Sequence, residues 1–286
     1  MATSKGLQLK IVSIGEITID HYPELNLSFV GGISLNFAIH AKRCGATAST
    51  PSREQAVSLV SRIGSDDNGR FVLNKLSQEK INASHVVILD GKTATCTILV
   101  RDAGERIFPE GGYCPNVLTS LQLTQAELRF IQQHDILVAR YDHSQPDPFF
   151  DQVMVDLNFN GKRVADFGDW ADFDGNVAVM LTYLDKLDLA FVSGNQEAIE
   201  TLRPISYQID TVIVVTLGAA GSVAVVNGRV YSQPAVLVSN PLDTTGCGDA
   251  FQAAFTVTYF QTGNIAQALT QGATLAAKII QQYGAL

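Results

Sequence analysis

A glycine-rich stretch near the end of the sequence places a carboxylate beside a group of backbone amides. Asp243-Thr-Thr-Gly-Cys-Gly-Asp249 precedes the apolar run Ala250-Phe-Gln-Ala-Ala-Phe, which predicts a loop that enters a helix. The first N–H groups of a helix have no partner within the helix and lie at the positive end of its dipole, so they bind anions. We expect these donors at Gly246, Cys247 and Gly248.

Asp249 follows these amides directly and is the candidate general base. Phosphoryl transfer to an alcohol needs this arrangement, because a base takes the hydroxyl proton while donors hold the transferring phosphoryl group. The alternative is an acidic residue in the first turn of a helix that interacts favourably with the dipole and has no chemical role. The spacing alone is compatible with both interpretations.

Two further polar signals follow predicted strands. Glu16 and Asp20 come after the apolar run Leu9–Ile14, at the carboxyl end of a strand, where open α/β sheets bind their ligands. Thr216-Leu-Gly-Ala-Ala-Gly221 follows the β-branched run Val212–Val215, and its glycines would let a nucleotide approach the backbone closely. The alternative for the second signal is a plain turn.

The elements that must position these residues alternate along the chain. Apolar runs predict strands at Leu9–Ile14, Val57–Ile63, Asp135–Arg140, Arg163–Asp166, Asp188–Val192, Thr211–Thr216, Ser222–Val226, Arg229–Ser232 and Ala235–Val238. Helices are predicted at Ser34–Lys42, Asp67–Ser77, Leu123–His134, Phe149–Asn158, Asn195–Leu202, Gly246–Gln261 and Ile265–Tyr283, and a surface loop at 46–56. This order predicts an α/β fold with a doubly wound, mostly parallel sheet flanked by helices.

One segment has a different pattern. Thr93–Arg101 alternates polar and apolar residues and turns at Asp102–Glu105 into Arg106–Phe108, which is typical of an antiparallel hairpin with one face in water. We interpret it as a small antiparallel flap that projects from the main sheet. The alternative is an edge hairpin of that sheet.

The composition limits the classes of function. The chain has 286 residues, close to the upper size of roughly 250–300 residues for one core, so we expect a single domain over 1–286. The net charge is −8 and Lys and Arg form no cluster, which argues against nucleic acid and membranes as partners. No run of about 18 apolar residues is present, and the first ten residues lack an apolar signal core. We therefore expect a cytoplasmic protein.

Several well-known motifs are absent from the sequence. It has no Walker P-loop, no Gly-x-Ser-x-Gly elbow and no Gly-x-Gly-x-x-Gly fingerprint, which argues against P-loop enzymes, α/β-hydrolases and Rossmann-type oxidoreductases. The four cysteines form no Cys-x-x-Cys pair and are expected as reduced thiols. His40 and Cys44 would share a helical face, but no further zinc ligands follow at suitable spacing.

The remaining signals resemble those of the ribokinase/PfkB family of sugar kinases, in the same order. Gly31-Gly32 with Asn36, the turn Thr216–Gly221 and the stretch Asp243–Asp249 match that order, and the last resembles the family's Asp-Thr-x-Gly-Ala-Gly-Asp signature. The resemblance extends from about residue 9 to the end of the sequence. The chain is also similar to the fructoselysine kinase branch at Tyr22-Pro-Glu-Leu-Asn, Asp166-Phe-Gly-Asp-Trp and Gln271–Lys278, and at Tyr283-Gly-Ala.

The resemblance implies an ATP-dependent kinase with a ribokinase-like fold that phosphorylates a primary hydroxyl. A fructosamine such as fructoselysine is the first acceptor it suggests, then a ketose or ribose, then a nucleoside. Asp249 would be the base, and the amides of Gly246, Cys247 and Gly248 the anion hole. The implied sugar-binding residues are Asp20, Gly31, Gly32, Asn36 and Arg106, and the implied ATP-binding residues are Thr216, Gly218, Gly221, Thr245 and Asn195. A catalytically silent module with a kinase-like fold is the alternative from another class.

The resemblance further implies Mg²⁺, possible use of a monovalent cation such as K⁺, and a lid over the sugar. The lid would consist of about residues 20–30 and 92–113, and homodimers through such lids occur in the family. Arg106 would lie on the lid and meet an anionic group of the substrate.

Two positions depart from the family pattern. The family's Asn-x-x-Glu element is here Asn195-Gln-Glu197, with the acid one residue early, so Glu197 and Asp166 are the candidate metal ligands and Asp169 a substitute. Cys247 replaces an alanine, and a thiol at a helix N-terminus is expected to have a lowered pKa.

Overall fold

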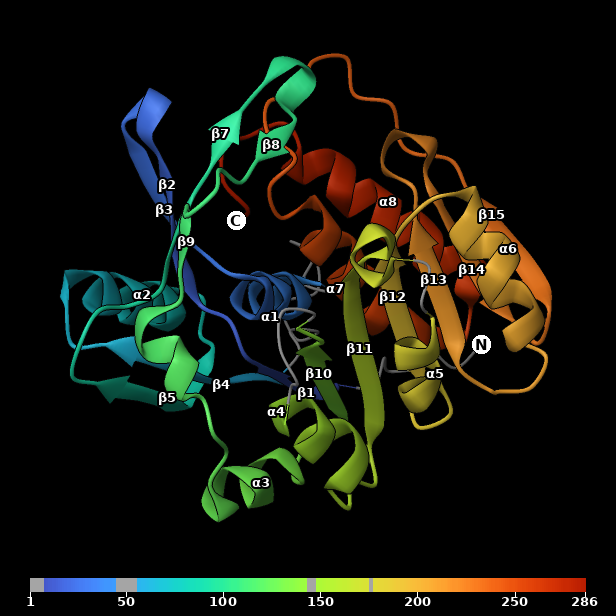
Figure 1. Ribbon diagram of the computed structural model, residues 1–286, viewed down its shortest axis with the longest axis horizontal. Coiled ribbons are helices and arrows are strands. Elements are labelled where there is room, and N and C mark those ends of the chain that lie inside the picture. The colour runs from blue at the N-terminus through green and yellow to red at the C-terminus, as the bar shows by residue number, and fades with distance from the viewer. Residues whose placement is uncertain (1–7, 45–55, 143–147, 175–176) are drawn as a thin grey trace, which may run out of the picture.

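The computed structural model describes residues 8–44, 56–142, 148–174 and 177–286, and these contain one large sheet with helices on both faces (Figure 1). Its strand order is β15-β14-β13-β12-β11-β10-β1-β4-β5. All neighbours from β13 to β5 pair in parallel, and β14 and β15 extend the sheet antiparallel. The strands are β1 (Lys10–Ile14), β4 (Ala56–Gly64), β5 (Asn82–Leu89), β10 (Ile136–Arg140), β11 (Lys162–Asp169), β12 (Leu189–Ser193), β13 (Val212–Thr216), β14 (Ser222–Val226) and β15 (Arg229–Gln233). The doubly wound, mostly parallel sheet predicted from the sequence is confirmed.

The helices form two layers, each with its own core. The described helices are α1 (Ile33–Arg43), α2 (Asp67–Gln78), α3 (Gln125–Ile131), α4 (Pro148–Asp151), α5 (Ala178–Leu184), α6 (Gln196–Ile205), α7 (Cys247–Thr262) and α8 (Ile265–Ile279). Buried side chains of α1, α2, α7 and α8 pack on one face of the sheet, and those of α3 to α6 on the other. Within β1, Ile11 belongs to the first core and Val12 to the second. Strands buried on both faces need continuous apolar runs, which explains why these strands were recognisable in the sequence.

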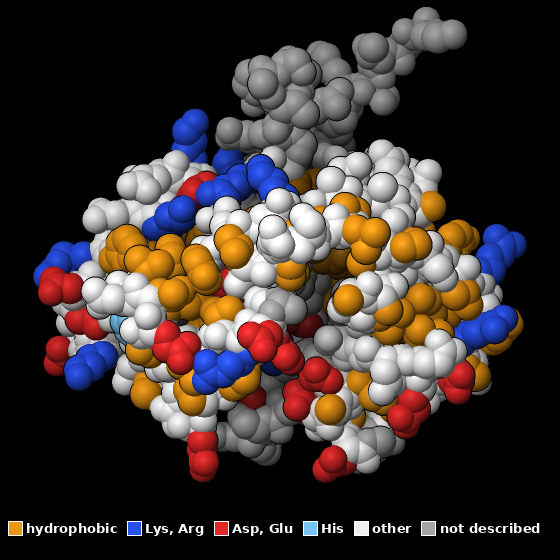
Figure 2. All heavy atoms as spheres, turned by 90° about the horizontal axis from the view of Figure 1, so that it is seen from above, with side chains coloured by type: hydrophobic (Ala, Val, Ile, Leu, Met, Phe, Trp, Pro, Cys, Tyr) orange, Lys and Arg blue, Asp and Glu red, His pale blue; other side chains and the backbone are white. Residues whose placement is uncertain are grey.

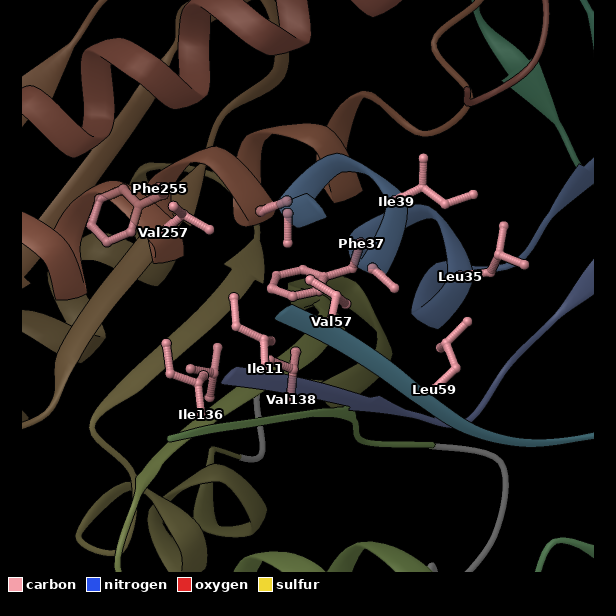
Figure 3. Close-up of a cluster of buried hydrophobic side chains, with 14 of the residues drawn as sticks. Ile11, Leu35, Phe37, Ile39, Val57, Leu59, Ile136, Val138, Phe255 and Val257 are labelled. Carbon is pink, nitrogen blue, oxygen red and sulfur yellow. The ribbon is translucent and has the colours of Figure 1, made fainter. Parts of the chain in front are cut away.

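Figure 3 shows how the first core joins distant parts of the chain. Phe37 of α1 points towards Ile11 of β1 and Val57 of β4. Leu35 and Ile39 of α1 and Phe255 of α7 belong to the same cluster. Burial of each such side chain contributes about 1.5–3 kcal/mol to stability. Packing of α1 and α7 in this layer brings residues about 36 and 249 of the sequence together.

A second, small sheet lies apart from the large one. Its order is β3 (Leu27–Gly31), β2 (Thr18–Tyr22), β6 (Thr95–Thr97) and β9 (Tyr113–Cys114), antiparallel except for the parallel pair of β2 and β6. β7 (Leu99–Val100) and β8 (Arg106–Ile107) form a separate antiparallel hairpin next to it (Figure 1). The predicted hairpin therefore exists, and the alternative that it forms an edge of the large sheet is wrong.

Some predicted elements differ from the structure. Ala235–Val238 was predicted as a strand and forms none, because β15 ends where Pro234 provides no N–H for pairing. β5 was missed because it is an edge strand with exposed and partly exposed residues at most positions. The helix predicted at Phe149–Asn158 is the short α4 followed by a π turn at Gln152–Asp156. All but the last residue of the loop predicted at 46–56 lies outside the described residues.

Short single turns connect the main elements. They are 3₁₀ turns at Pro23–Leu25, Asp102–Gly104, Asn116–Ser120, Trp170–Phe173 and Gly218–Ala220. Within the described part of the chain, no helix is both long and apolar enough to cross a membrane.

A buried ion pair fastens α3 to the large sheet. The Arg62 guanidinium donates from Nη1 to Glu127 Oε1 at 2.7 Å and from Nη2 to Glu127 Oε2 at 3.1 Å, and both side chains are almost fully buried. Glu127 also accepts a hydrogen bond from the backbone N–H of Thr124 at the start of α3. Burying two charges is costly, but removing one partner is more so, because the other charge stays buried alone.

We predict that Arg62→Leu lowers the free energy of unfolding by about 3–5 kcal/mol, because it strands the Glu127 carboxylate in the interior. The matched control is Arg43→Leu, which breaks a pair with Glu79 at the surface and should cost about 1 kcal/mol or less. Urea unfolding of the two variants and the parent measures the difference. Equal losses in both variants would contradict the role of the buried pair.

Candidate active site

The loop after β15 ends in the N-terminus of α7, as the sequence predicted. Gly246 is the N-cap residue and has φ +74°, a conformation that glycine adopts without strain. A Cβ at this position would lie 2.2 Å from the Cβ of Ala285, so a larger residue would displace the neighbouring segment. Asp249 follows in the first turn of α7. The glycine at 246 is thus required both by the turn and by close packing.

Asp249 is held by a residue of α1. Its Oδ2 accepts a hydrogen bond of 2.8 Å from Asn36 Nδ2. Burial raises the pKa of the Asp249 carboxyl to about 6, and the negative charge of Asp166 adds to this, while the Asn36 hydrogen bond and the Arg106 and Arg140 charges oppose it. A carboxylate with a pKa near 6 is ionised at neutral pH and is still basic enough to take a proton from a hydroxyl.

The other half of the Asn36 amide is unsatisfied. Asn36 is 3% exposed, and its Oδ1 has no hydrogen-bond partner among the described residues. A buried acceptor without a partner costs about 1–3 kcal/mol, so such an atom indicates a place where a ligand donates.

Asp20 lies on β2 and is also buried. Burial raises its pKa to about 7, with the neighbouring charges of Glu16, Asp249 and Asp243 adding to the shift, and the Thr18 hydroxyl donates to its Oδ1 at 2.8 Å. A Cβ on Gly31, in the paired strand β3, would lie only 2.0 Å from Asp20 Oδ2. The absence of a side chain at 31 therefore makes the space that the Asp20 carboxylate occupies.

Gly32 is also required by close packing. It has φ +97°, and a Cβ there would lie 2.8 Å from the backbone of Glu16, Ile17 and Thr18. The Gly31-Gly32 pair thus lets β3 run directly into α1 against β2. Through this packing Asp20 and Asn36 are brought near Asp249, as their electrostatic coupling and hydrogen bond show.

Arg140 is a member of this group that the sequence interpretation missed. It ends β10, and the negative charges of Asp166, Glu16 and Asp249 raise the pKa of its guanidinium against the effect of burial. Gly168 has φ +68°, and a Cβ on it would lie 3.0 Å from Arg140 Nη2. The available signal was a charged residue at the carboxyl end of a buried strand, the criterion that singled out Glu16 and Asp20.

Arg106 joins the β7–β8 hairpin to the loop before α7. Its Nη1 donates to the Thr244 carbonyl at 2.8 Å, and its backbone N–H donates to Thr244 Oγ1 at 3.1 Å. Its guanidinium lies 5.4 Å from the ring centroid of Phe108. The positive charge of Arg106 acts on both Cys247 and Asp249, so this side chain belongs to the same site.

The structure contradicts the expectation for the Cys247 thiol. Burial raises its pKa to about 12, and the Asp243 and Asp249 charges add to the shift, although Arg106 opposes it. The thiol lies 3.9 Å from the carbonyl oxygen of Asp243. The helix N-terminus lowers the pKa of thiols that solvent or cations stabilise, and here removal from water is the larger effect.

The residues expected to bind nucleotide lie at the ends of β12 and β13. Thr216 ends β13, and the turn after it holds Gly218 with φ +56° and Gly221 with φ +105°. A Cβ on Gly221 would lie 2.2 Å from the carbonyl oxygen of Gln233, so the turn itself requires glycine there. Asn195 accepts from Ala198 N at 3.2 Å and caps α6.

Thr245 and the candidate metal ligands lie in different surroundings. Thr245 is 5% exposed, and its Oγ1 has no partner in the described part of the chain. Glu197 is exposed in the first turn of α6, Asp169 caps the turn after β11, and Asp166 is buried on β11, where its Oδ1 accepts from Gly168 N at 3.0 Å. Among the described residues, no three acidic, His or Cys side chains are grouped so that they could hold a metal ion by themselves, and His40 and Cys44 belong to no such group. Mg²⁺ commonly binds through one or two carboxylates, water and phosphates. A single carboxylate such as that of Asp166 therefore fits a metal ion that arrives with a nucleotide.

A cleft of about 530 Å³ lies beside the loop and not at Asp249. It is lined by Tyr22, Arg101, Gly104, Leu242 and Tyr283, among others, between the small sheet, the hairpin and the end of the chain. Figure 2 shows the molecule from above, with a hollow in the middle of this face and acidic side chains along its border. The cleft contains none of the residues expected to bind sugar or nucleotide.

Known proteins are similar to this chain over nearly its whole length. The model of the pfkB family carbohydrate kinases matches residues 8–162 and 176–286. Fructoselysine 6-kinase from Escherichia coli is 31% identical over 281 residues, covering 96% of this chain and 98% of that protein. Fructosamine kinase FrlD from Bacillus subtilis is 27% identical over 288 residues, covering 97% and 93% of the two chains.

Solved structures share the fold. Adenosine kinase from Sinorhizobium meliloti superposes with a TM-score of 0.83 at 17% identity, covering 98% of this chain and 96% of that one. A ribokinase from Arabidopsis thaliana, solved with ribose and ATP, gives a TM-score of 0.77 at 17% identity and covers 98% and 95%.

We predict that Asp20→Asn stabilises the protein in a pH-dependent way. Because the pKa of Asp20 is raised, the stability that this group contributes is fully present below pH 3.8 and is lost as the pH rises through about 7. The variant should therefore exceed the parent by on the order of a few kcal/mol at pH 8 and match it towards pH 4. Urea unfolding at pH 4.5, 6 and 8 measures this. A difference that does not change with pH would show that the buried charge is not its cause.

Proposed function

The chain belongs to the pfkB family of carbohydrate kinases, and we propose that it transfers the γ-phosphoryl group of ATP to a primary hydroxyl of a fructosamine such as fructoselysine. ATP-dependent phosphorylation of a sugar follows from the family. The narrower acceptor class is supported by the similarity to fructoselysine 6-kinase and fructosamine kinase over nearly the whole length of all three chains. We also propose that residues 1–286 form a single domain.

One observation carries the chemical part of the proposal: Asp249 lies in the first turn of α7 and is oriented by Asn36. We assign Asp249 as the general base. Asn36 binds Oδ2, so Oδ1 is the oxygen that we assign to the acceptor hydroxyl. Oδ1 takes the hydroxyl proton as the hydroxyl oxygen attacks the γ-phosphorus, whose bond to the bridging oxygen breaks and releases ADP. With a pKa of about 6, the carboxylate is in the required ionised form at pH 7.

The amides of Gly246, Cys247 and Gly248 are the proposed anion hole. They precede or begin α7, where N–H groups have no hydrogen-bond partner within the helix. The Cys247 N–H donates to the Thr244 carbonyl of the preceding loop at 3.3 Å, so a phosphoryl oxygen would have to replace that hydrogen bond. Loss of one donor from such a hole typically costs about 10²–10³ in rate.

We assign the acceptor sugar to the space between the small sheet and α7. Asp20 and the unsatisfied Asn36 Oδ1 would accept hydrogen bonds from its hydroxyls. Gly31 and Gly32 are proposed to contribute through their backbone, and their missing side chains make room for the Asp20 carboxylate and for the backbone of residues 16–18. The positive charge of Arg106 acts on Asp249, and we propose that it also meets an anionic group of the substrate. The small sheet and hairpin, at about 20–30 and 92–113, are the proposed lid, which excludes water from the reaction.

ATP is assigned to the carboxyl ends of β12 and β13. Thr216, Gly218 and Gly221 would line the nucleotide, and Asn195 and the unsatisfied Thr245 Oγ1 would approach the phosphates. Asp166 is the proposed contact to Mg²⁺ through water, with Glu197 or Asp169 as further contacts, and the ion supplies neutralisation of charge on the phosphates. Use of K⁺ and a homodimer through the lid remain predictions.

The first test is a comparison of acceptors. With ATP and Mg²⁺, we expect kcat/KM for fructoselysine to exceed that for fructose and ribose by at least about tenfold, because even one apolar contact discriminates by about 10–200-fold. Coupled detection of ADP across fructoselysine, fructose, ribose, 2-keto-3-deoxygluconate and adenosine measures it. Preference for adenosine would indicate a nucleoside kinase, and background turnover on every acceptor would favour a catalytically silent binding module.

The second test concerns the base. Asp249→Asn should lower kcat by about 10²–10⁴, because the variant cannot take the proton. ATP affinity should stay within twofold of the parent, and the melting temperature should not fall, since the buried charge is gone. Asp185→Asn, at an exposed acid beside Lys186, is the control and should keep full activity. Normal turnover in Asp249→Asn would show that another residue is the base.

A further inference from the structure

His40, a buried histidine of α1, contacts the segment that packs against the proposed anion hole. We propose that His40 is a positioning residue for phosphoryl transfer, and that it acts by holding Ala285 against Gly246. This inference rests on the proposed function of Asp249 and of the amides at the start of α7. It gives a role to a buried titratable group and to a segment, Tyr283–Ala285, that the proposed chemistry does not otherwise use.

The contact between His40 and Ala285 is short and shielded from water. His40 Nε2 lies 2.7 Å from the carbonyl oxygen of Ala285, and the two residues are 1% and 0% exposed. Burial lowers the pKa of His40 to about 4, so the ring is neutral at pH 7. A carbonyl oxygen can only accept, and therefore Nε2 carries the proton of the neutral ring.

Ala285 in turn touches the N-cap glycine of α7. A Cβ placed on Gly246 would lie 2.2 Å from the Ala285 Cβ and 2.7 Å from its Cα, so the two backbones are in close contact. The neighbouring Gly284 donates its N–H to Asp243 Oδ2 at 2.9 Å. The loop before α7 thus rests on Gly284 and Ala285, and a displacement of this segment would move the amides that follow Gly246.

The Asp243 side chain also connects this loop to the small sheet. Tyr22 of β2 donates its hydroxyl to Asp243 Oδ2 at 2.7 Å, and Thr245 N donates to Oδ1 at 2.9 Å. Asp243 is fully buried. The hydroxyl and the two N–H groups fix the orientation of this side chain, and with it the course of the loop.

α1 therefore holds both parts of the catalytic group. Asn36 and His40 are four residues apart, so they lie on the same face of the helix. Asn36 binds the Asp249 carboxylate, and His40 reaches Gly246 through Ala285. One rigid helix thus orients the carboxylate of the base and supports the backbone that carries the amides. Placement within about 0.5 Å is what such groups need, and a misplacement of 1 Å can cost about 10²-fold in rate.

The test compares His40→Leu with His40→Gln. Leucine removes the donor, whereas the glutamine amide can still donate near the position of Nε2. We expect kcat with fructoselysine and saturating ATP to fall about 10–100-fold in His40→Leu, with both KM values within about twofold of the parent, and to recover to within about threefold of the parent in His40→Gln. The matched control is His134→Leu. His134 follows α3, whose side chains pack on the face of the large sheet opposite α1, and its Nε2 lies 2.9 Å from Ser58 Oγ. Its loss should leave kcat unchanged.

A second measurement does not depend on turnover. Amide hydrogen–deuterium exchange in the peptide that covers residues 243–249 should be faster in His40→Leu than in the parent and in His134→Leu. Unchanged kcat and unchanged exchange in His40→Leu would overturn the inference. The same holds for a loss of kcat that His40→Gln does not reverse. A parent that phosphorylates no acceptor, but whose loop exchange does respond to His40→Leu, would refute the proposed function and show only that His40 supports the loop.

Discussion

The contact between α1 and the N-terminus of α7 is the constraint on which the site depends. It brings Asn36 to Asp249 across 213 positions of sequence, and His40 to Ala285 across 245. The contact is possible only because α1 and α7 share one face of the large sheet and bury their apolar side chains in one core. The geometry of the candidate site is therefore a consequence of packing between helices on one face of the sheet and not of any single loop. Local glycines then allow the backbones to approach, at Gly31, Gly32 and Gly246.

The charges at the site balance one another in a way that favours proton transfer. Asp20 and Asp249 have raised pKa values because both are removed from water near other carboxylates. Two cations limit this effect at Asp249, one from the end of β10 and one from the β7–β8 hairpin. Arg140 is fixed within the large sheet, whereas Arg106 depends on the hairpin and its contacts with Thr244. The basicity of Asp249 is thus coupled to the position of the hairpin, because withdrawal of Arg106 would raise its pKa further.

The sequence was informative wherever one residue type was required for a local physical reason. Buried parallel strands need continuous apolar runs, and so β1 and β13 were recognisable. The turn at Gly246 needs glycine, and so the start of α7 was found. Arg140 and His40 were not assigned to the site, because their roles depend on partners far away in the sequence. Cys247 shows the same limit, since the rule for thiols at helix termini does not include burial.

The reaction is easier to infer than the acceptor because the two depend on different parts of the fold. Asp249 and the amides of α7 belong to the large α/β unit, and the reaction type follows from the family of the whole chain. The proposed acceptor site faces the small sheet, where Tyr22, Cys96 and Ile98 form a small separate cluster and Tyr113 is exposed. Such a surface tolerates substitution, so acceptors can diverge among relatives that keep the same catalytic group. Tyr22 is the exception, because its bond to Asp243 ties the small sheet to the catalytic loop.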